Sequence, residues 1–191
     1  MSVEGSNARQ LTKGDSEGSQ PAFSPNGTQL AFTCRTGSAS RICIMNRDGS
    51  NMHAITPANR ECLWPAWSPD GKRIAYWSQY EEVWVTDLGI GEPVRLFAPG
   101  PGASTLDWSP DGRQILFAPA TGEHAGNQLF DIASAQTKRI LGADWKAAGP
   151  RWSPDGRQVL FASYNANPGI YCLDMSNSRV RKIVTEADIP Q

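Results

Sequence analysis

The sequence predicts an all-β protein built from four repeated units of four strands each. Two observations predict it: a short core recurs four times along the 191 residues, and no stretch shows a sustained helical period. The repeated cores are PAFSPNGTQLAF from Pro21, PAWSPDGKRIAY from Pro65, LDWSPDGRQILF from Leu106 and PRWSPDGRQVLF from Pro150. Spacings of 44, 41 and 44 residues separate their shared serines, Ser24, Ser68, Ser109 and Ser153. A period in the low forties is the length of one four-stranded propeller blade.

Each core predicts an inner strand, a tight turn and a second strand. In Trp67-Ser68-Pro69-Asp70-Gly71 the proline presets φ for the turn, the aspartate suits the next position, and the glycine takes the left-handed conformation that closes a hairpin. The first repeat carries Asn26 instead of Asp, which the same turn tolerates. The second strands are apolar on both faces, as is typical of strands between neighbouring sheets: QLAFTC, RIAYWS, QILFAP and QVLFAS.

A third and a fourth strand complete each repeat. The third strands are RICIMN from Arg41, EVWVTD from Glu82, NQLFDI from Asn127 and GIYCLD from Gly169. The fourth strands, MHAIT, PVRLF, TKRIL and VRKIV, mix basic and apolar residues, as expected at an outer edge where charge discourages pairing with other chains. We therefore predict blades at residues 20–57, 62–98, 103–142 and 147–185.

The N-terminal residues predict one additional outer strand. Residues 5–12 match residues 49–56 at an offset of 44, with identical Gly, Ser, Asn and Thr. We expect residues 1–12 to be the outer strand of an incomplete upstream blade, because the last blade already has its own outer strand. The predicted fold class is thus all-β, a beta-propeller segment of four four-stranded antiparallel blades plus one orphan N-terminal outer strand.

These repeats resemble the TolB-like beta-propeller family, whose WD-like repeats are built around Trp-Ser-Pro-Asp-Gly. Three of the four repeats carry the full string, at Trp67, Trp108 and Trp152, and the resemblance covers nearly the whole chain. The family includes the periplasmic TolB protein, which binds other envelope proteins, and the gating propellers of prolyl-oligopeptidase-like serine peptidases. The resemblance therefore implies a scaffold for protein or peptide binding, or the propeller of a hydrolase, and a periplasmic or extracytoplasmic location.

Charge and hydropathy exclude several classes of partner. The chain has 18 Lys and Arg against 19 Asp and Glu, and no block of one sign, so it offers no electrostatic footprint for nucleic acid or an anionic membrane. No apolar run approaches the ~20 residues that a membrane span needs, and the first residues lack the apolar segment of a secretory signal. We expect a soluble chain with no membrane insertion.

Catalytic and metal-binding patterns are weak. The string Gly14-Asp15-Ser16-Glu17-Gly18 matches a hydrolase nucleophile elbow, but it joins an outer strand to an inner strand instead of leading into a helix. His53 and His124 are the only histidines and belong to no cluster of ligands or bases. Residues 46–51 lack the alternating acids of a calcium loop and are better explained as a hairpin turn. We expect no catalytic residue, metal or cofactor.

The four cysteines leave the redox state open. Cys34 and Cys43 lie on neighbouring predicted strands, so a cross-strand disulfide is geometrically allowed if their side chains face each other. Cys62 and Cys172 have no evident partner. Because four cysteines admit three pairings, the sequence favours free thiols.

Propellers bind ligands with the loops at one end of the ring, here those between the fourth and first strands and between the second and third strands. Aromatic residues together with arginine resemble an interaction hot spot. The large or charged residues of these loops are Arg60, Glu61, Trp64, Tyr80, His124, Asp144, Trp145, Lys146 and Tyr164. The favoured alternative for Trp64 and Trp145 is that they fill gaps between blades.

Other repeated positions are expected to be structural. They are the core aromatics Trp67, Trp108 and Trp152, which Phe23 replaces once, and the turn acids Asp70, Asp111 and Asp155. Asp107 and Arg151 occupy equivalent positions in consecutive blades, one residue before the core aromatic. We expect them to pair near the central channel, where an unpaired charge is costly.

An open ring of four blades would expose the flat apolar faces of its first and last blades. We therefore expect a homo-oligomer that covers these faces, most simply two chains with eight blades, and a closed four-bladed ring is the alternative. Three functions stay open: a non-catalytic scaffold for a protein or peptide, a propeller fragment of a serine peptidase or another hydrolase, and a repeat array without a selected ligand.

Overall fold

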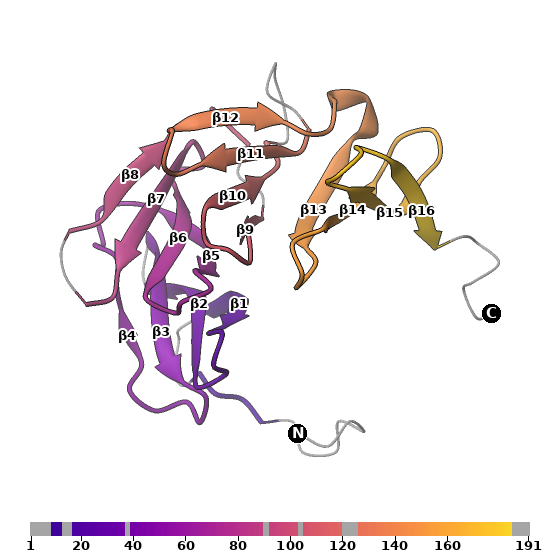
Figure 1. Cartoon of the computed structure of the whole chain (residues 1–191). Helices are drawn as coiled ribbons and strands as arrows, with labels where there is room; N and C mark the ends of the chain where they lie inside the picture. Colours follow the sequence, from indigo (N-terminus) through magenta and orange to yellow (C-terminus); the bar gives the residue numbers. More distant parts are fainter. Residues whose placement is uncertain are drawn as a thin grey trace.

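The computed structural model describes residues 9–12, 17–36, 39–89, 92–102, 105–119 and 126–184, which form four antiparallel sheets of four strands. The sheets stand side by side as the blades of an open arc, with one strand of each toward the centre and the first and last sheets at opposite ends of the arc (Figure 1). The four predicted repeats are therefore four propeller blades. The alternative of a closed four-bladed ring is wrong for this chain.

Every blade is a meander in which each strand pairs with the next one along the chain. Blade 1 consists of β1 (Glu17–Phe23), β2 (Gln29–Thr36), β3 (Ala39–Asn46) and β4 (His53–Ala54). Blade 2 consists of β5 (Cys62–Trp67), β6 (Arg73–Ser78), β7 (Glu82–Asp87) and β8 (Val94–Phe97). Blade 3 consists of β9 (Leu106–Trp108), β10 (Gln114–Phe117), β11 (Gln128–Asp131) and β12 (Gln136–Arg139). After the 3₁₀ turn η1 (Ala143–Trp145), blade 4 consists of β13 (Ala147–Trp152), β14 (Gln158–Ser163), β15 (Gly169–Asp174) and β16 (Val180–Val184).

The turn between the first and second strands has the same hydrogen bonds in all four blades. In blade 2 the Ser68 hydroxyl donates to Asp70 at 2.5 Å and accepts from the backbone N–H of Arg73 at 2.9 Å. Gly71 closes the turn with a φ of 68°. In blade 1 Asn26 accepts the equivalent bond from Ser24 at 2.8 Å. The turn chemistry expected from the repeated core is confirmed, with asparagine and aspartate interchangeable.

Apolar clusters and repeated tryptophans join neighbouring blades. The indole N–H of Trp67 donates to the carbonyl of Ala22 in blade 1, and that of Trp108 donates to the carbonyl of Ala66 in blade 2, both at 3.1 Å. The indole N–H of Trp152 is buried and has no hydrogen-bond partner among the described residues. The junction between blades 3 and 4 therefore lacks the bond that closes the other two.

The two end faces of the arc differ from each other. On blade 1, Leu30, Phe32 and Met45 are buried, and Leu11 packs against them. On blade 4, Leu160 and Ile183 are 43% and 39% exposed. Phe23, which pairs with Leu30, is nevertheless 57% exposed, so the face of blade 1 is covered only in part and Phe23 is not the buried core aromatic that its repeat position predicted.

Part of the predicted orphan strand can be located. Residues 9–12 carry no strand and lie against blade 1, where the Arg9 guanidinium donates to the carbonyl of Asp48 at 2.9 Å. The remaining residues of that prediction, 1–8, lie outside the described residues. So do residues 14–16 of the G-x-S-x-G string.

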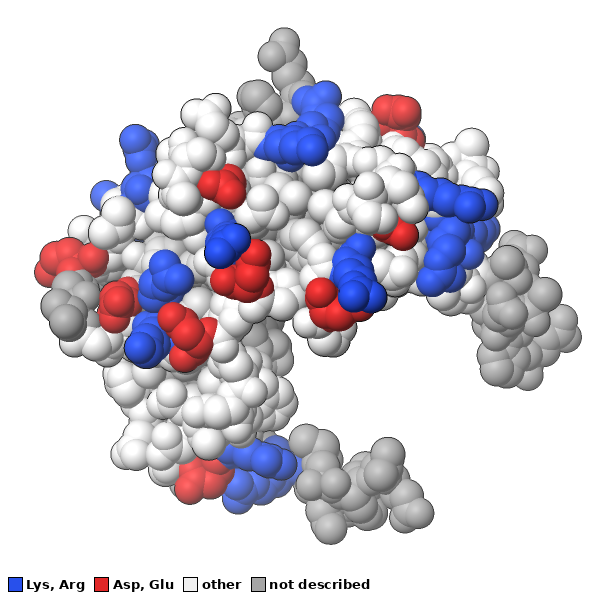
Figure 2. Space-filling model, in the orientation of Figure 1, with Lys and Arg blue, Asp and Glu red and all other residues white. Residues whose placement is uncertain are grey.

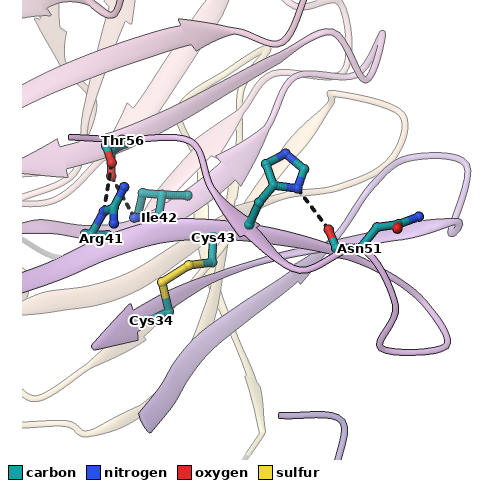
Figure 3. The surroundings of a disulfide bond; sticks show 7 residues. Cys34, Arg41, Ile42, Cys43, Asn51 and Thr56 are labelled. Carbon is teal, nitrogen blue, oxygen red and sulfur yellow. Dashed lines mark hydrogen bonds between the residues drawn. A yellow bond between two sulfur atoms is a disulfide. The ribbon is translucent and has the colours of Figure 1, made fainter. Parts of the chain in front are cut away.

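A disulfide between Cys34 and Cys43 links β2 to β3 (Figure 3). The expectation of free thiols is wrong for this pair and right for Cys62 and Cys172, which are free and buried. Cys34 pairs in register with Arg41, and Cys43 pairs with Phe32. The two cysteines are therefore diagonal neighbours on one face of the sheet, with their Cα atoms 5.8 Å apart.

Candidate functional site

The connection between β4 and β5 and the turn between β6 and β7 meet at the rim between blades 1 and 2. Together they line a cavity of about 440 Å³ that contains Arg60, Glu61 and Tyr80. Tyr80 is 48% exposed. We call Arg60, Glu61, Trp64 and Tyr80 the rim cluster.

Arg60 is held in place by the sheet below it. Its guanidinium carbon lies 4.4 Å from the ring centroid of Trp84, and it forms an ion pair of 3.7 Å with Glu82. Glu82 also accepts hydrogen bonds from the Trp84 indole at 2.8 Å and from Arg95 at 3.0 Å. These two donors lower the pKa of Glu82, so it stays ionised beside Arg60.

Glu61 brings an unsatisfied acceptor to the same cavity. One of its carboxylate oxygens is buried from solvent and has no hydrogen-bond partner in the part of the chain that the structure describes. Its backbone carbonyl accepts from the N–H of Gln79, which fixes the residue against the β6–β7 turn. A buried acceptor without a partner costs folding free energy.

Trp64 lies inside β5 at a bulge, not in the loop where the sequence placed it. Its φ of 51° is uncommon for a bulky residue. Its backbone N–H donates to the side chains of Gln20 at 3.1 Å and Thr33 at 3.3 Å, and its ring meets Tyr80 edge-on at 6.5 Å. The ring also packs against the core between blades 2 and 3, so the gap-filling role that the sequence favoured is part of its environment.

A second cavity, of about 480 Å³, lies on the axis of the arc, and we call it the axial cavity. It is lined by the inner strands β1, β5 and β9 and by Arg151 of β13. Trp64, a member of the rim cluster, also lines the axial cavity.

Asp107 and Arg151 meet at the axial cavity, but they do not form the predicted ion pair among the described residues. Arg151 donates to the carbonyl of Leu106 at 2.8 Å, and Asp107 accepts from the backbone N–H of Trp152 at 2.7 Å. The predicted direct pairing is wrong because each side chain bonds the main chain of the opposite strand. Burial raises the pKa of Asp107, against the opposing effects of the Trp152 N–H and the Arg151 charge.

The remaining predicted rim residues form a separate group between blades 3 and 4. The Trp145 ring packs edge-on against Phe161 at 5.7 Å and Tyr171 at 5.2 Å, so it fills a gap between blades. Tyr164 is 68% exposed, and its backbone N–H donates to the carbonyl of Lys146 at 3.4 Å. Asp144 lies in η1 and is exposed. His124 lies outside the described residues.

The sequence did not single out Gln20 or Arg73, although both connect neighbouring blades. Gln20 accepts a hydrogen bond from Thr33 of its own blade at 2.6 Å and from the Trp64 N–H of blade 2. Arg73 places its guanidinium carbon 4.9 Å from the ring centroid of Trp108 in blade 3. Their positions in the repeat could have identified them, because Gln20 directly precedes the repeated proline and Arg73 follows the repeated serine by five residues.

The face shown in Figure 2 carries basic and acidic side chains side by side, with no region of a single sign. In the part of the chain that the structure describes, no three His, Cys, Asp or Glu residues are grouped as a metal site. The turn at residues 46–51 uses its acid internally, because Asp48 accepts from both the N–H and the hydroxyl of Ser50. No helix among the described residues has the length and apolar character of a membrane span.

Four meandering blades around an axial cavity define a β-propeller segment. A family model described as "TolB beta propeller domain" matches residues 35–190, and the chain belongs to this family. No curated protein matches the chain.

Solved structures show the same fold. A candidate TolB from Agrobacterium tumefaciens is 25% identical with a TM-score of 0.76, over 85% of this chain and 63% of that one. TolB from Acinetobacter baumannii is 18% identical with a TM-score of 0.82, over 94% and 46% of the two chains. A puromycin-hydrolyzing peptidase from Mycobacterium tuberculosis is 16% identical with a TM-score of 0.73, over 91% and 29%. The chain thus spans between about half and two thirds of the two TolB structures.

Proposed function

We propose that this domain is a non-catalytic binding module that holds a protein or peptide at the rim between blades 1 and 2. The observation that carries the proposal is the rim cluster, in which separate elements bring Arg60 and Tyr80 to one cavity of about 440 Å³ and the Trp64 ring packs edge-on against Tyr80. Arginine, tryptophan and tyrosine dominate the binding energy of protein interfaces. Arg60 is already oriented by Trp84 and Glu82, so binding would immobilise little additional side chain.

Backbone strain supports the same assignment. Gln79 and Tyr80 are consecutive residues with φ of 53° and 60°, in a turn where glycine or asparagine is normally preferred. Bulky residues in this region cost stability and are concentrated at functional sites. The strained turn presents the Tyr80 ring to solvent beside Trp64.

A random peptide library displayed on phage tests the proposal. Peptides selected on the wild-type chain should bind Tyr80→Ala at least tenfold more weakly, since a hot-spot tyrosine contributes about 2 kcal/mol or more. Tyr164→Ala is the matched control, because Tyr164 is an exposed tyrosine at the other rim group. Selected peptides that bind Tyr80→Ala as well as wild type would refute the rim as the binding site.

A second candidate function is that of a propeller belonging to a hydrolase whose catalytic domain lies elsewhere. The observation behind it is the similarity in fold to the mycobacterial peptidase. The two candidates are separated by the parent reading frame: a G-x-S-x-G elbow followed by an acid and a histidine favours the hydrolase. Under either candidate, the chain alone should release no nitroaniline from aminoacyl nitroanilides, and hydrolysis would contradict both.

We also propose that a second copy of the chain covers the exposed face of blade 4. Leu160 and Ile183 are apolar and exposed there, on an arc whose ends do not meet (Figure 1). This contact between two copies would form the homo-oligomer expected from the sequence, and no different partner would be needed.

A further inference from the structure

A third cavity, of about 410 Å³, lies between the inner turns of blades 3 and 4. Pro110, Asp111 and Gln114 line it from blade 3, and Trp152 and Asp155 line it from blade 4. We call it the junction cavity. It lies at the ends of the blades where the first and second strands turn, and the rim cluster lies at the opposite ends.

The preceding junction shows what fits such a space. There, Arg73 of blade 2 stacks its guanidinium on Trp108 of blade 3, with 4.9 Å between the guanidinium carbon and the ring centroid. Arg73 and Gln114 each follow the repeated serine by five residues, and Trp108 and Trp152 each precede it directly. Gln114 and Trp152 therefore occupy the positions of Arg73 and Trp108. Gln114 is shorter and carries no charge, so the Trp152 ring lacks the stacked cation.

The junction cavity also reflects a more open junction. At the first junction Gln29 holds the same position, yet Trp67 is only 8% exposed and its indole N–H is bonded. Trp108, under its arginine, is 4% exposed. Trp152 is partly exposed, and its indole N–H has no partner within the described ranges. The third junction therefore combines an uncovered ring with unfilled space.

Two ionised carboxylates border that space. The hydroxyls of Ser109 and Ser153 and two backbone N–H groups lower the pKa values of Asp111 and Asp155. Neither carboxylate takes part in an ion pair among the described residues. The nearest basic residues along the chain are Arg113 and Arg157, two residues after Asp111 and Asp155. Neither arginine lines the cavity. A cavity lined by an aromatic ring and two carboxylates attracts a cation.

We propose that the junction cavity binds an arginine side chain of a partner protein or peptide. The guanidinium stacks on Trp152, as Arg73 does on Trp108, and its N–H groups point to Asp111 and Asp155. Arginine fits better than lysine because its planar group both stacks and donates in several directions. The site lies away from the rim cluster, so it stands or falls independently of the proposed function.

The test compares an arginine probe with citrulline, its uncharged analogue. N-acetyl-arginine methylamide is titrated into ¹⁵N-labelled chain, with N-acetyl-citrulline methylamide as the uncharged control. Trp152→Phe assigns the indole N–H resonance of Trp152 by its disappearance. That resonance should shift saturably with the arginine probe, in about the millimolar range expected for one side chain, and weaken with added salt. No shift, or an equal shift with citrulline, overturns the proposal.

Two charge variants sharpen the test without disturbing the turns. Asp111→Asn with Asp155→Asn should keep the fold, because Asn26 already makes the same turn in blade 1. We expect roughly tenfold weaker probe binding, with a small fall in melting temperature that is no larger per site than the fall in Asp70→Asn, since the folded chain lowers the pKa of all three acids. Asp70→Asn, in the equivalent turn outside the cavity, is the matched control and should bind normally. Unchanged affinity in the double variant overturns the proposal.

Gln114→Arg supplies the cation from within the chain and copies the pair formed by Arg73 and Trp108. It should abolish the shift of the Trp152 resonance by the probe and raise the melting temperature. A Gln114→Arg chain that binds the probe like wild type would show that the cavity does not hold a guanidinium.

Discussion

The carboxylate of Asp107 on β9 accepts a hydrogen bond of 2.7 Å from the backbone N–H of Trp152 on β13. At the two earlier junctions, an indole N–H joins neighbouring blades by bonding a backbone carbonyl. At this junction the indole is unpaired, and side chains replace that bond, because Arg151 reaches the carbonyl of Leu106 in the opposite direction. Blade 4 is therefore attached partly through ionisable groups, beside the apolar cluster that it shares with blade 3, and we expect its attachment to depend on pH.

Asp107→Asn should become more stable relative to wild type as the pH rises from about 4 to about 7. Burial raises the pKa of Asp107, so the folded chain binds this proton more tightly than the unfolded chain does. Its contribution to stability is full below the ordinary carboxyl pKa and is lost as the pH rises through the folded value. In Asp107→Asn the amide oxygen can still accept the hydrogen bond from the Trp152 N–H, and because asparagine does not titrate, this variant does not lose stability as the pH rises. Urea unfolding midpoints of both proteins across this range measure the difference.

Asp111→Asn is the control for this pH dependence, and its stability relative to wild type should change with pH in the opposite direction. The pKa of Asp111 is lowered, so its contribution is present above the ordinary carboxyl pKa and disappears as the pH falls. Asp111→Asn should therefore lose stability relative to wild type as the pH rises through the range below about 4, and the difference should then stay nearly constant up to about pH 7. A pH-independent difference between wild type and Asp107→Asn would contradict the burial of a charged Asp107.

Ser68→Ala should destabilise the chain by about 1–3 kcal/mol, since it leaves a backbone N–H without its acceptor. The Ser68 hydroxyl is fully buried and holds both sides of the inner turn of blade 2, through Asp70 and Arg73. Ser134→Ala, in an exposed turn of blade 3, is the control and should change stability by about 0.5 kcal/mol or less. Chemical unfolding followed by tryptophan fluorescence measures both. Equal effects would mean that the repeated serine is not structural.

The sequence predicted the blades because a repeat presents the same local chemistry four times. Each Ser-Pro-Asp-Gly turn and each apolar second strand carries its own signal, as the bonds of Ser68 show. The position of Trp64 was missed although its bulge recurs, because β1, β5 and β13 all shift register directly before the proline of the repeat, where Gln20, Trp64 and Gly149 have φ of 55°, 51° and 59°. The partners of Asp107 were missed for a different reason. Equivalent sequence positions indicate proximity, but whether a side chain bonds a side chain or a backbone group depends on the spacing of the blades.

The sequence predicted which types of residue form the candidate site better than it predicted which of them lie together. Arg60 and Tyr80 were named from the loops, and the structure places both beside one cavity. Trp145 was named from the same pattern but packs against Phe161 and Tyr171. Composition cannot separate an exposed aromatic from one that fills a gap between blades, because the distinction depends on what the neighbouring blade presents.

Loss of the disulfide should lower the free energy of unfolding by about 2–3 kcal/mol, as expected for the short loop closed by residues nine apart. Cys34→Ser with Cys43→Ser, or an excess of reductant, removes the bond. Cys172→Ala, which removes a free thiol, should not respond to reductant differently from wild type. Intact mass before and after alkylation under denaturing conditions counts the thiols. Four alkylated cysteines in protein purified without reductant would contradict the disulfide.

Leu160→Asp should dissociate the proposed oligomer. Leu160 is 43% exposed on blade 4, and a buried aspartate at an interface between two copies would be left unpaired. Val94→Asp is the matched control, because Val94 is 61% exposed on the outer strand of blade 2, away from the ends of the arc. Light scattering during size exclusion should give twice 20.8 kDa for wild type and Val94→Asp, and 20.8 kDa for Leu160→Asp. A wild-type monomer over a wide concentration range would refute self-association. An oligomer that persists in Leu160→Asp would place the interface on another surface.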